Sequence, residues 1–194
     1  MIFGRGSVQH TSVFPFGGMN FTKDIAVGLR VSIPDAEKIK RRFGCVAGFL
    51  LQDEEKQGII EITPVGRNET RQLTKEILCD IMQPRAVELL QHIAEEITNV
   101  GAQISSGVVL TGGSSLTRGT VEIAEQVFDA PTRLGIPGKI IFGGLIDAIQ
   151  TPEWAVACGL TLSSMRSQMR NYHGGKSPSQ RVARWFESFR EKFR

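Results

Sequence analysis

The fold of this chain is decided by one stretch, Val108-Val109-Leu110-Thr111-Gly112-Gly113-Ser114-Ser115-Leu116. The apolar, β-branched residues predict a buried strand, the glycine pair a tight turn, and the residues from about Leu116 to Phe128 a helix. Glycines let the backbone approach a flat or anionic ligand, and a helix N-terminus offers free N–H groups to it. Glycine pairs also occur at strand-to-helix turns for steric reasons alone, so this motif by itself leaves both interpretations open.

Strands alternate with helices along the rest of the chain, which predicts an α/β fold. The expected strands are Ser7–Phe16, Val46–Leu51 paired with Gly58–Val65, and Thr132–Ile136. The expected helices are Thr22–Val31, Asp35–Gly44, Leu73–Val100 and Trp154–Met169. Pro84 is expected to kink or break the third of these helices. The chain opens as if halfway through a hairpin, which suggests an incomplete sheet.

Composition is that of an ordinary soluble globular protein, with 41% hydrophobic and 22% charged residues among 194. The three cysteines form no C-x-x-C pair, which favours a reducing cytoplasm over a disulfide framework or a zinc site. The three histidines are scattered, so no metal site is predicted. No apolar run approaches the roughly 20 residues of a membrane span, and no signal peptide is visible.

The C-terminal segment has the pattern of an amphipathic helix that begins near Pro178, with Ser177 as its N-cap. Its large apolar residues share one face about 100° wide: Val182, Trp185, Phe186, Phe189 and Phe193. The basic residues predicted to meet anionic lipid are Arg181, Arg184, Arg190 and Lys192. This predicts a helix that lies flat on a membrane, held to the body by a polar linker over residues 165–177. Docking onto the protein itself, or binding of nucleic acid, are the alternatives.

The strength of such an anchor follows from its size. Partial burial of five large apolar side chains gives roughly 4–8 kcal/mol, and each basic residue adds about 1 kcal/mol. The ordering of a short helix and the loss of free motion oppose this gain. A single tail is therefore expected to bind reversibly, whereas several tails on one polymer would bind strongly.

Two motifs together carry a family resemblance. Residues 108–119 are similar to the adenosine motif of the actin-like and heat-shock-chaperone-like ATPases. Ala36-Glu37-Lys38-Ile39-Lys40 is similar to the helix whose Glu and Lys approach the nucleotide ribose in bacterial actins. The chain more specifically resembles the FtsA family of bacterial cell-division proteins at four places: Phe16–Gly18 with Thr22–Arg30, Gly135–Pro137, Pro152–Ala155, and Gly159-Leu160.

The resemblance implies the C-terminal lobe of an actin-like fold, incomplete at its N-terminus, with an inserted small α+β subdomain and a C-terminal amphipathic helix. The implied divisions are 1–34 and 104–164 for the lobe, 35–103 for the subdomain, 165–177 for the linker and 178–194 for the membrane helix. The residues implied to contact adenosine are Glu37, Lys40, Gly112, Gly113 and Ser114. The D-x-G phosphate loops, which with Mg²⁺ hold ATP in the intact family, have no counterpart in this sequence. The chain alone is therefore expected to bind nucleotide feebly and to lack hydrolysis, with no catalytic residue; Asp24 is expected to hold its helix or the domain edge.

The resemblance also implies a function: a cytoplasmic adaptor that polymerises with copies of itself and tethers the tubulin-like protein FtsZ to the anionic inner membrane at the division site. The C-terminal peptide of FtsZ would bind the small subdomain, where Arg67, Arg71 and Lys75 are candidate contacts for its acidic residues. No nucleic acid is expected as a partner. The rival interpretations are an ATP-dependent enzyme or chaperone of the same superfamily and a pilus-assembly actin-like protein. Neither gives the terminal helix a role.

Overall fold

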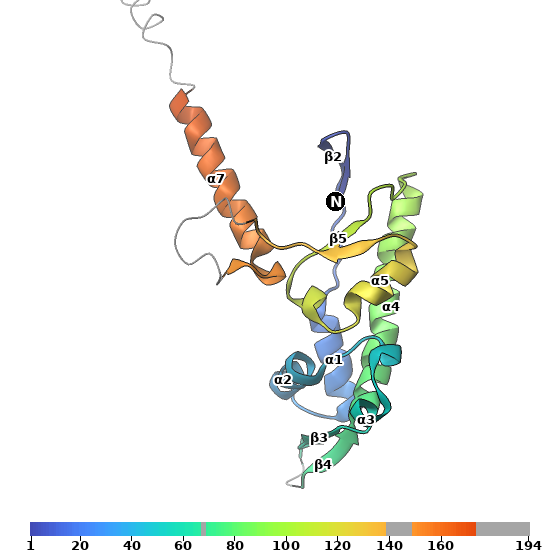
Figure 1. The fold of residues 1–194 in the computed structure, drawn as a ribbon. Coiled ribbons are helices and arrows are strands. Elements are labelled where there is room, and N and C mark those ends of the chain that lie inside the picture. Colours follow the sequence, from blue (N-terminus) through green and yellow to red (C-terminus); the bar gives the residue numbers. More distant parts are fainter. Residues whose placement is uncertain (67–68, 139–148, 174–194) are drawn as a thin grey trace, which may run out of the picture.

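The structure is a computed structural model, and the residues it describes are 1–66, 69–138 and 149–173, with side chains through residue 167 (Figure 1). The strands are β1 (Ile2–Gly4), β2 (Ser7–His10), β3 (Ile59–Ile62), β4 (Arg71–Thr74), β5 (Val108–Leu110) and β6 (Thr132–Leu134). The α-helices are α1 (Gly18–Leu29), α2 (Ile33–Phe43), α3 (Asp53–Lys56), α4 (Lys75–Asn99), α5 (Thr120–Phe128) and α7 (Ala155–His173). Short 3-10 helices are η1 (Gly48–Leu50), η2 (Gly113–Leu116) and η3 (Pro152–Trp154). Arg67 and the predicted membrane helix 178–194 lie outside the described residues.

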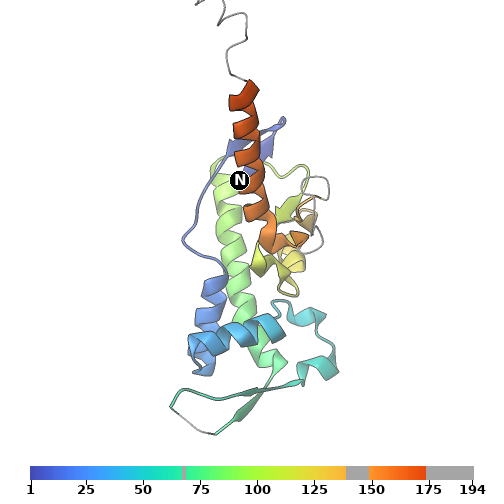
Figure 2. The same cartoon turned by 90° about the vertical axis from the view of Figure 1, so that its left-hand side faces the viewer.

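Helix α4 is the long axis of the molecule, and the other elements are arranged around it (Figure 2). Its 25 residues run from the β3–β4 hairpin at one end to the N-terminal hairpin at the other. Helix α1 packs beside its first half, and α2 packs against α1. The core that they share is centred on fully buried side chains, among them Ile25, Leu78 and Met82.

Local signals explain where α2 begins and ends. Ser32 caps the helix, because its Oγ accepts a hydrogen bond from the Asp35 backbone N–H at 3.2 Å. Pro34 lies in the first turn, where its missing N–H costs nothing. Basic residues in the last turn, Lys40 among them, complement the helix dipole. The apolar face then buries Ala36 and Ile39 against α1.

The predicted strand–turn–helix–strand unit is present. Strand β5 pairs with β6 in parallel, from Val108 opposite Thr132 to Leu110 opposite Leu134. Helix α5 connects the two strands and packs against α4. The other strands pair as antiparallel hairpins, β1 with β2 and β3 with β4, so the described strands form three two-stranded sheets.

The predicted pairing of Val46–Leu51 with a second strand is wrong. Val46, Ala47 and Leu51 of that segment are buried without being in a strand, and the chain between them turns through η1. The partner of β3 is β4, where Leu73 pairs with Ile60 and buries its side chain. A run of apolar residues predicts burial more securely than it predicts a strand, and this run is buried by packing against α4.

Other boundaries also differ from the sequence prediction. Pro84 lies inside α4, which continues through it. The Gly-Gly turn continues into η2, which ends at Leu116 where Thr117 turns extended. The α-helix then begins at Thr120, after Gly119 with φ +89°. Strand β2 stops at His10, and the next residues run without regular structure to the stacked rings of Phe14 and Phe16.

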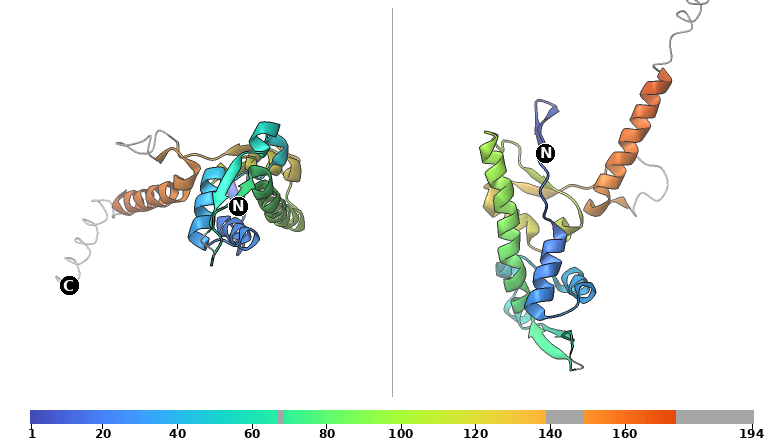
Figure 3. Two further views of the ribbon diagram at one scale, coloured as in Figure 1. Left: turned by 90° about the horizontal axis from the view of Figure 1, so that it is seen from below. Right: turned by 180° about the vertical axis from the view of Figure 1, so that it is seen from behind.

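Helix α7 leaves the body of the molecule at an angle, with only its first turns near the other elements (Figure 3). It extends to His173, so residues 165–173 are helical where a linker was expected. Several large apolar side chains on it are exposed, among them Val156 at 64% and Leu160 at 68%. Among the described residues, no helix is long and apolar enough to span a bilayer.

Candidate functional site

A polar cluster joins the N-terminal half of α1 to α2. Lys40 Nζ donates to the Gly18 carbonyl oxygen at 3.1 Å and to Thr22 Oγ1 at 2.8 Å, and it pairs with Glu37 Oε2 at 2.6 Å. Thr22 is fully buried, and its hydroxyl also donates to Glu37 Oε2 at 2.6 Å. The donors of Lys40 and one oxygen of Glu37 are therefore used to hold the two helices together.

The glycine turn after β5 is the second part of the site. Gly112 adopts φ +92°, and its N–H donates to the Pro152 carbonyl oxygen at 2.9 Å, which fixes the turn against η3. Ser115 is buried and its Oγ donates back to the Gly112 carbonyl oxygen at 2.7 Å. A Cβ atom placed on Gly112 or Gly113 would meet no atom of the described residues within 4 Å, so among these residues the two glycines border open space. The positive φ of Gly112 requires a glycine for backbone reasons, whereas neither packing nor a positive φ requires one at position 113, and the space beside Gly113 leaves room for a ligand.

The structure brings these two parts together. A Cβ atom on Gly18 would lie 2.2 Å from Ser114 Oγ and 3.8 Å from Lys40 Nζ, so the start of α1 touches both the glycine turn and α2. Five predicted adenosine contacts therefore surround one place: Glu37, Lys40, Gly112, Gly113 and Ser114. Sequence reasoning missed Gly18 and Thr22, although the quoted Phe16–Gly18 and Thr22–Arg30 motifs contain them.

Glu37 has the protonation state that a ribose contact needs. Burial would raise the pKa of its carboxyl group, but hydrogen bonds from Lys40 and Thr22 and the charges of Lys40 and Arg41 outweigh it and lower the pKa. The group therefore stays ionised at neutral pH. Its Oε2 holds Lys40 and Thr22, and its Oε1 has no hydrogen-bond partner among the described residues. A carboxylate oxygen in that state can accept a hydrogen bond from a sugar hydroxyl.

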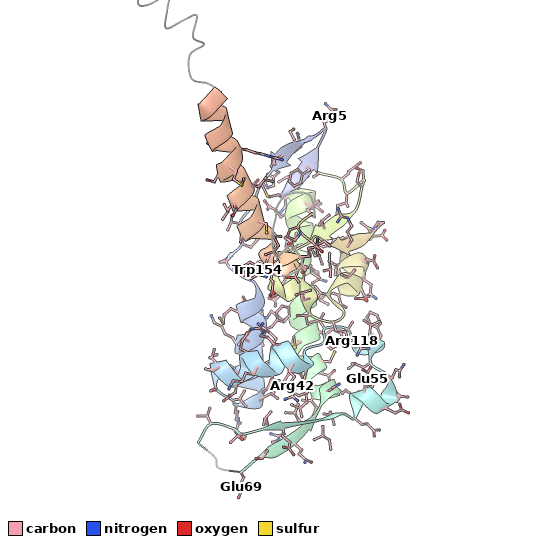
Figure 4. All side chains as sticks on the ribbon, turned by 60° about the vertical axis from the view of Figure 1, so that its left-hand side comes forward. Arg5, Arg42, Glu55, Glu69, Arg118 and Trp154 are labelled. Carbon is pink, nitrogen blue, oxygen red and sulfur yellow. The ribbon has the colours of Figure 1, made fainter. Side chains whose placement is uncertain are left out.

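Arg118 fastens the end of the adenosine motif to the segment after α2, and sequence reasoning missed it. Its guanidinium donates to Glu55 Oε1 at 2.8 Å and to the Leu50 carbonyl oxygen at 2.9 Å (Figure 4). Its own carbonyl oxygen accepts from the Val46 N–H at 2.9 Å. The ion pair with Arg118 lowers the pKa of Glu55. The motif is thus held in place at two points: at Ser114, by contact with Gly18, and at Arg118, by the bonds just described.

The predicted peptide contacts are not gathered in one place. Arg71 is exposed at the far end of β4, opposite Ile62. Lys75 begins α4, and its backbone N–H donates to the Gly58 carbonyl oxygen at the other end of the hairpin. With Arg67 outside the described residues, the structure shows two separate basic side chains along the β3–β4 hairpin.

Comparison with known proteins shows which family this chain belongs to. A family model described as "Cell division protein FtsA" matches residues 1–159. The chain belongs to the FtsA family. It is 36% identical over 169 residues to the cell division protein FtsA of Pseudomonas aeruginosa, and 34% identical over 168 residues to that of Escherichia coli K12. A third FtsA, from Neisseria meningitidis, is 33% identical over 201 residues and the match covers 96% of this chain.

The FtsA-family chain spans less than half the length of these relatives: 39% of the first two and 47% of the third. The matches fall in their C-terminal halves. Two solved structures share the fold at 15% identity, both of MreB5 of Spiroplasma citri. The one bound to AMPPNP has a TM-score of 0.63 and covers 88% of this chain and 50% of that one; the one bound to ADP has a TM-score of 0.58. The fold is therefore actin-like, as predicted.

Proposed function

We propose that this chain is the part of an FtsA-family protein that links the FtsZ polymer to the cytoplasmic face of the inner membrane at the division site. The observation that carries the proposal is the family match over residues 1–159, followed by a segment with the pattern of a basic amphipathic helix. The Neisseria meningitidis match leaves 4% of the chain uncovered, which is fewer residues than the predicted helix holds. The similarity therefore reaches into that helix.

The adenosine side of an ATP site supports the same proposal. The acceptor at Glu37 and the open glycine turn suit a ribose and an adenine, which are the parts of the ligand that carry no charge. Mg²⁺ and triphosphate need charge-neutralising contacts of the kind that phosphate loops supply. We expect this chain to contribute the adenosine contacts and the intact relatives to bind the ATP.

The proposed partner of the β3–β4 hairpin is the acidic C-terminal peptide of FtsZ. Arg71 and Lys75 supply positive charge to one edge of the small subdomain, and Ile59 is a large apolar side chain 62% exposed on the same hairpin. A mixed apolar and basic edge suits a peptide that carries both kinds of residue. If neither Arg71→Glu nor Lys75→Glu weakens peptide binding in fluorescence anisotropy, this site is excluded.

Vesicle sedimentation tests the membrane role. Phe189→Glu and Ser188→Glu change the charge equally at neighbouring positions, but only the first replaces a residue on the predicted apolar face. We expect Phe189→Glu to reduce binding to anionic vesicles by tenfold or more, since about 1.4 kcal/mol accounts for each factor of ten. Ser188→Glu should weaken binding much less.

Two further measurements separate this proposal from its rivals. Binding should fall on neutral vesicles and fall only partly at high salt, because both charge and apolar burial contribute. Equal loss of binding in the two variants would point to a purely electrostatic tail. Tight binding of single-stranded DNA with a steep salt dependence would overturn the membrane assignment.

A further inference from the structure

Two buried cysteines lie together in a place that the adenosine-side site does not use. Cys45 follows α2, and Cys79 lies one turn into α4, 34 positions later in the chain. They are 3% and 1% exposed, and with Leu51 they form an apolar cluster separate from the main core. The third cysteine, Cys158 on α7, lies elsewhere and lines an apolar pocket between α7 and β5.

Hydrogen bonds around the pair hold the segment that follows Cys45 against α4, where Cys79 lies. Cys45 Sγ donates to the Ala47 carbonyl oxygen at 3.4 Å, and Cys79 Sγ to Gln83 Oε1 at 3.9 Å. Gln83 Oε1 also accepts from the Gly48 N–H at 3.0 Å, so it fixes the segment after Cys45 to α4. Burial, and after it the charge and hydrogen bond of the Cys45 thiol, raise the pKa of Cys79 to about 12.

We propose that Cys45 and Cys79 are a redox pair that a peroxide converts into an intrachain disulfide. The sulfur of Cys45 attacks one peroxide oxygen, the O–O bond breaks, and Cys45 becomes a sulfenic acid as one water leaves. The sulfur of Cys79 then displaces the hydroxyl group, which takes up the Cys79 proton and leaves as a second water. The two thiols lose two electrons and two protons, and the peroxide gains them.

The order of the two steps follows from the surroundings of each sulfur. Cys79 acts second, as the resolving thiol, because it lies inside α4, whereas Cys45 lies at the start of the short segment that can open. Burial also keeps the proton on the Cys79 thiol by raising its pKa. Burial keeps the peroxide away until the segment after Cys45 opens. That segment holds only η1 and α3, of three and four residues, and it is fastened by Gln83 and Arg118. Oxidation should therefore proceed at the rate of this local opening.

The disulfide would act on the segment that holds the adenosine motif. Cys45 forms an isolated β-bridge with Arg118, the next-to-last residue of this motif. A bond from Cys45 to Cys79 would fix α4 covalently to that bridge and would constrain the unfolded chain between the two residues. The oxidised protein should melt at a higher temperature than the reduced one.

The experiment uses the full chain with Cys158→Ala, so that the pair is the only source of thiols. After exposure to hydrogen peroxide and alkylation in denaturant, we expect a mass loss of about 2 Da, with no alkylated cysteine. Peptide mapping should show the link between residues 45 and 79, and dithiothreitol should reverse both the link and the rise in melting temperature. In Cys158→Ala with Cys79→Ser, the remaining Cys45 should stop as a sulfenic acid that dimedone traps.

Matched variants make the outcome decisive. In Cys158→Ala with Cys45→Ser, Cys79 should stay a thiol that iodoacetamide alkylates after unfolding. Intermolecular disulfides, sulfinic acids without a 45–79 link, or thiols unchanged after hours in peroxide would each overturn the proposal. Peptide mapping of the unmutated chain repeats the test without any substitution. None of these outcomes depends on the membrane or nucleotide role.

Discussion

Gly119 is the residue at which the adenosine motif and the segment after α2 come closest. It adopts φ +89°, and a Cβ atom there would lie 2.4 Å from the Cβ of Ala47. Gly119→Ala should therefore destabilise the protein by about 3 kcal/mol, from backbone strain and from overpacking together. Gly66→Ala is the matched control, since Gly66 has φ +76° and a Cβ atom placed there would meet no atom of the described residues within 4 Å. In urea unfolding, Gly66→Ala should lower the free energy of unfolding by about 1 kcal/mol. Equal losses of stability in the two variants would contradict the close contact at Gly119.

Glu37 should make stability depend on pH. Its pKa is lowered in the folded state, so it stabilises the fold above its unfolded value of 4.5 and loses this contribution as the pH falls through the folded value. Glu37→Gln should therefore show a smaller loss of melting temperature than the unmutated chain between pH 6 and pH 3. Glu54→Gln removes an exposed carboxylate without a hydrogen-bond partner among the described residues. That control should keep the full pH dependence.

At the scale of elements, one ion pair fixes α1 against α4. Arg85 Nε donates to Asp24 Oδ2 at 2.6 Å and Nη2 to Oδ1 at 3.1 Å, which confirms the expected structural role of this aspartate. Asp24→Asn should cost about 1–2 kcal/mol, because the pair is partly buried and bidentate. Glu88→Gln removes the contact of Arg85 within α4 and should cost under about 0.5 kcal/mol. Chemical denaturation of both variants compares the two, and a larger loss in Glu88→Gln would assign the stabilisation to α4 alone.

The elements that the sequence predicts best are those with their own start and stop signals. Helix α2 has Ser32, Pro34 and Gly44, and its observed bounds lie within two residues of the expected ones. The segment after Gly44 has no such signals. Its apolar residues are buried by α4 and by the bridge to Arg118, which are contacts made across more than 30 residues. Local sequence cannot show such contacts.

The same reasoning separates the predicted from the missed site residues. Glu37 and Lys40 are recognisable because residues 36–40 resemble the helix that approaches the nucleotide ribose in bacterial actins. Thr22 and Arg118 are ordinary polar residues in sequence. They gain a role only because folding places one beneath the ion pair and the other beside Glu55.

At the scale of the whole molecule, one face carries more exposed apolar surface than a solitary domain usually does. It includes the exposed side chains of Val109 and Ile136, which line an apolar pocket of about 300 Å³ together with Gly159 and Leu162 of α7. The isolated chain should therefore self-associate as its concentration rises. Light scattering after size exclusion should show Leu162→Gln, which replaces a residue that lines the pocket, shifted toward monomer. Ser164→Gln adds the same side chain on the opposite side of α7 and should leave the self-association unchanged. A concentration-independent monomer would contradict this.

Helix α4 connects two distant parts of the molecule. Near one end it holds Cys79 and Gln83 against the segment of Cys45; near the other, Glu96 meets His10 and Ser12 beside the N-terminal hairpin. A 25-residue helix is roughly 37 Å long, so a tilt of about 10° would carry its far end by roughly 6 Å. A small tilt of α4 at one end would thus move its other end by more than the spacing between neighbouring strands.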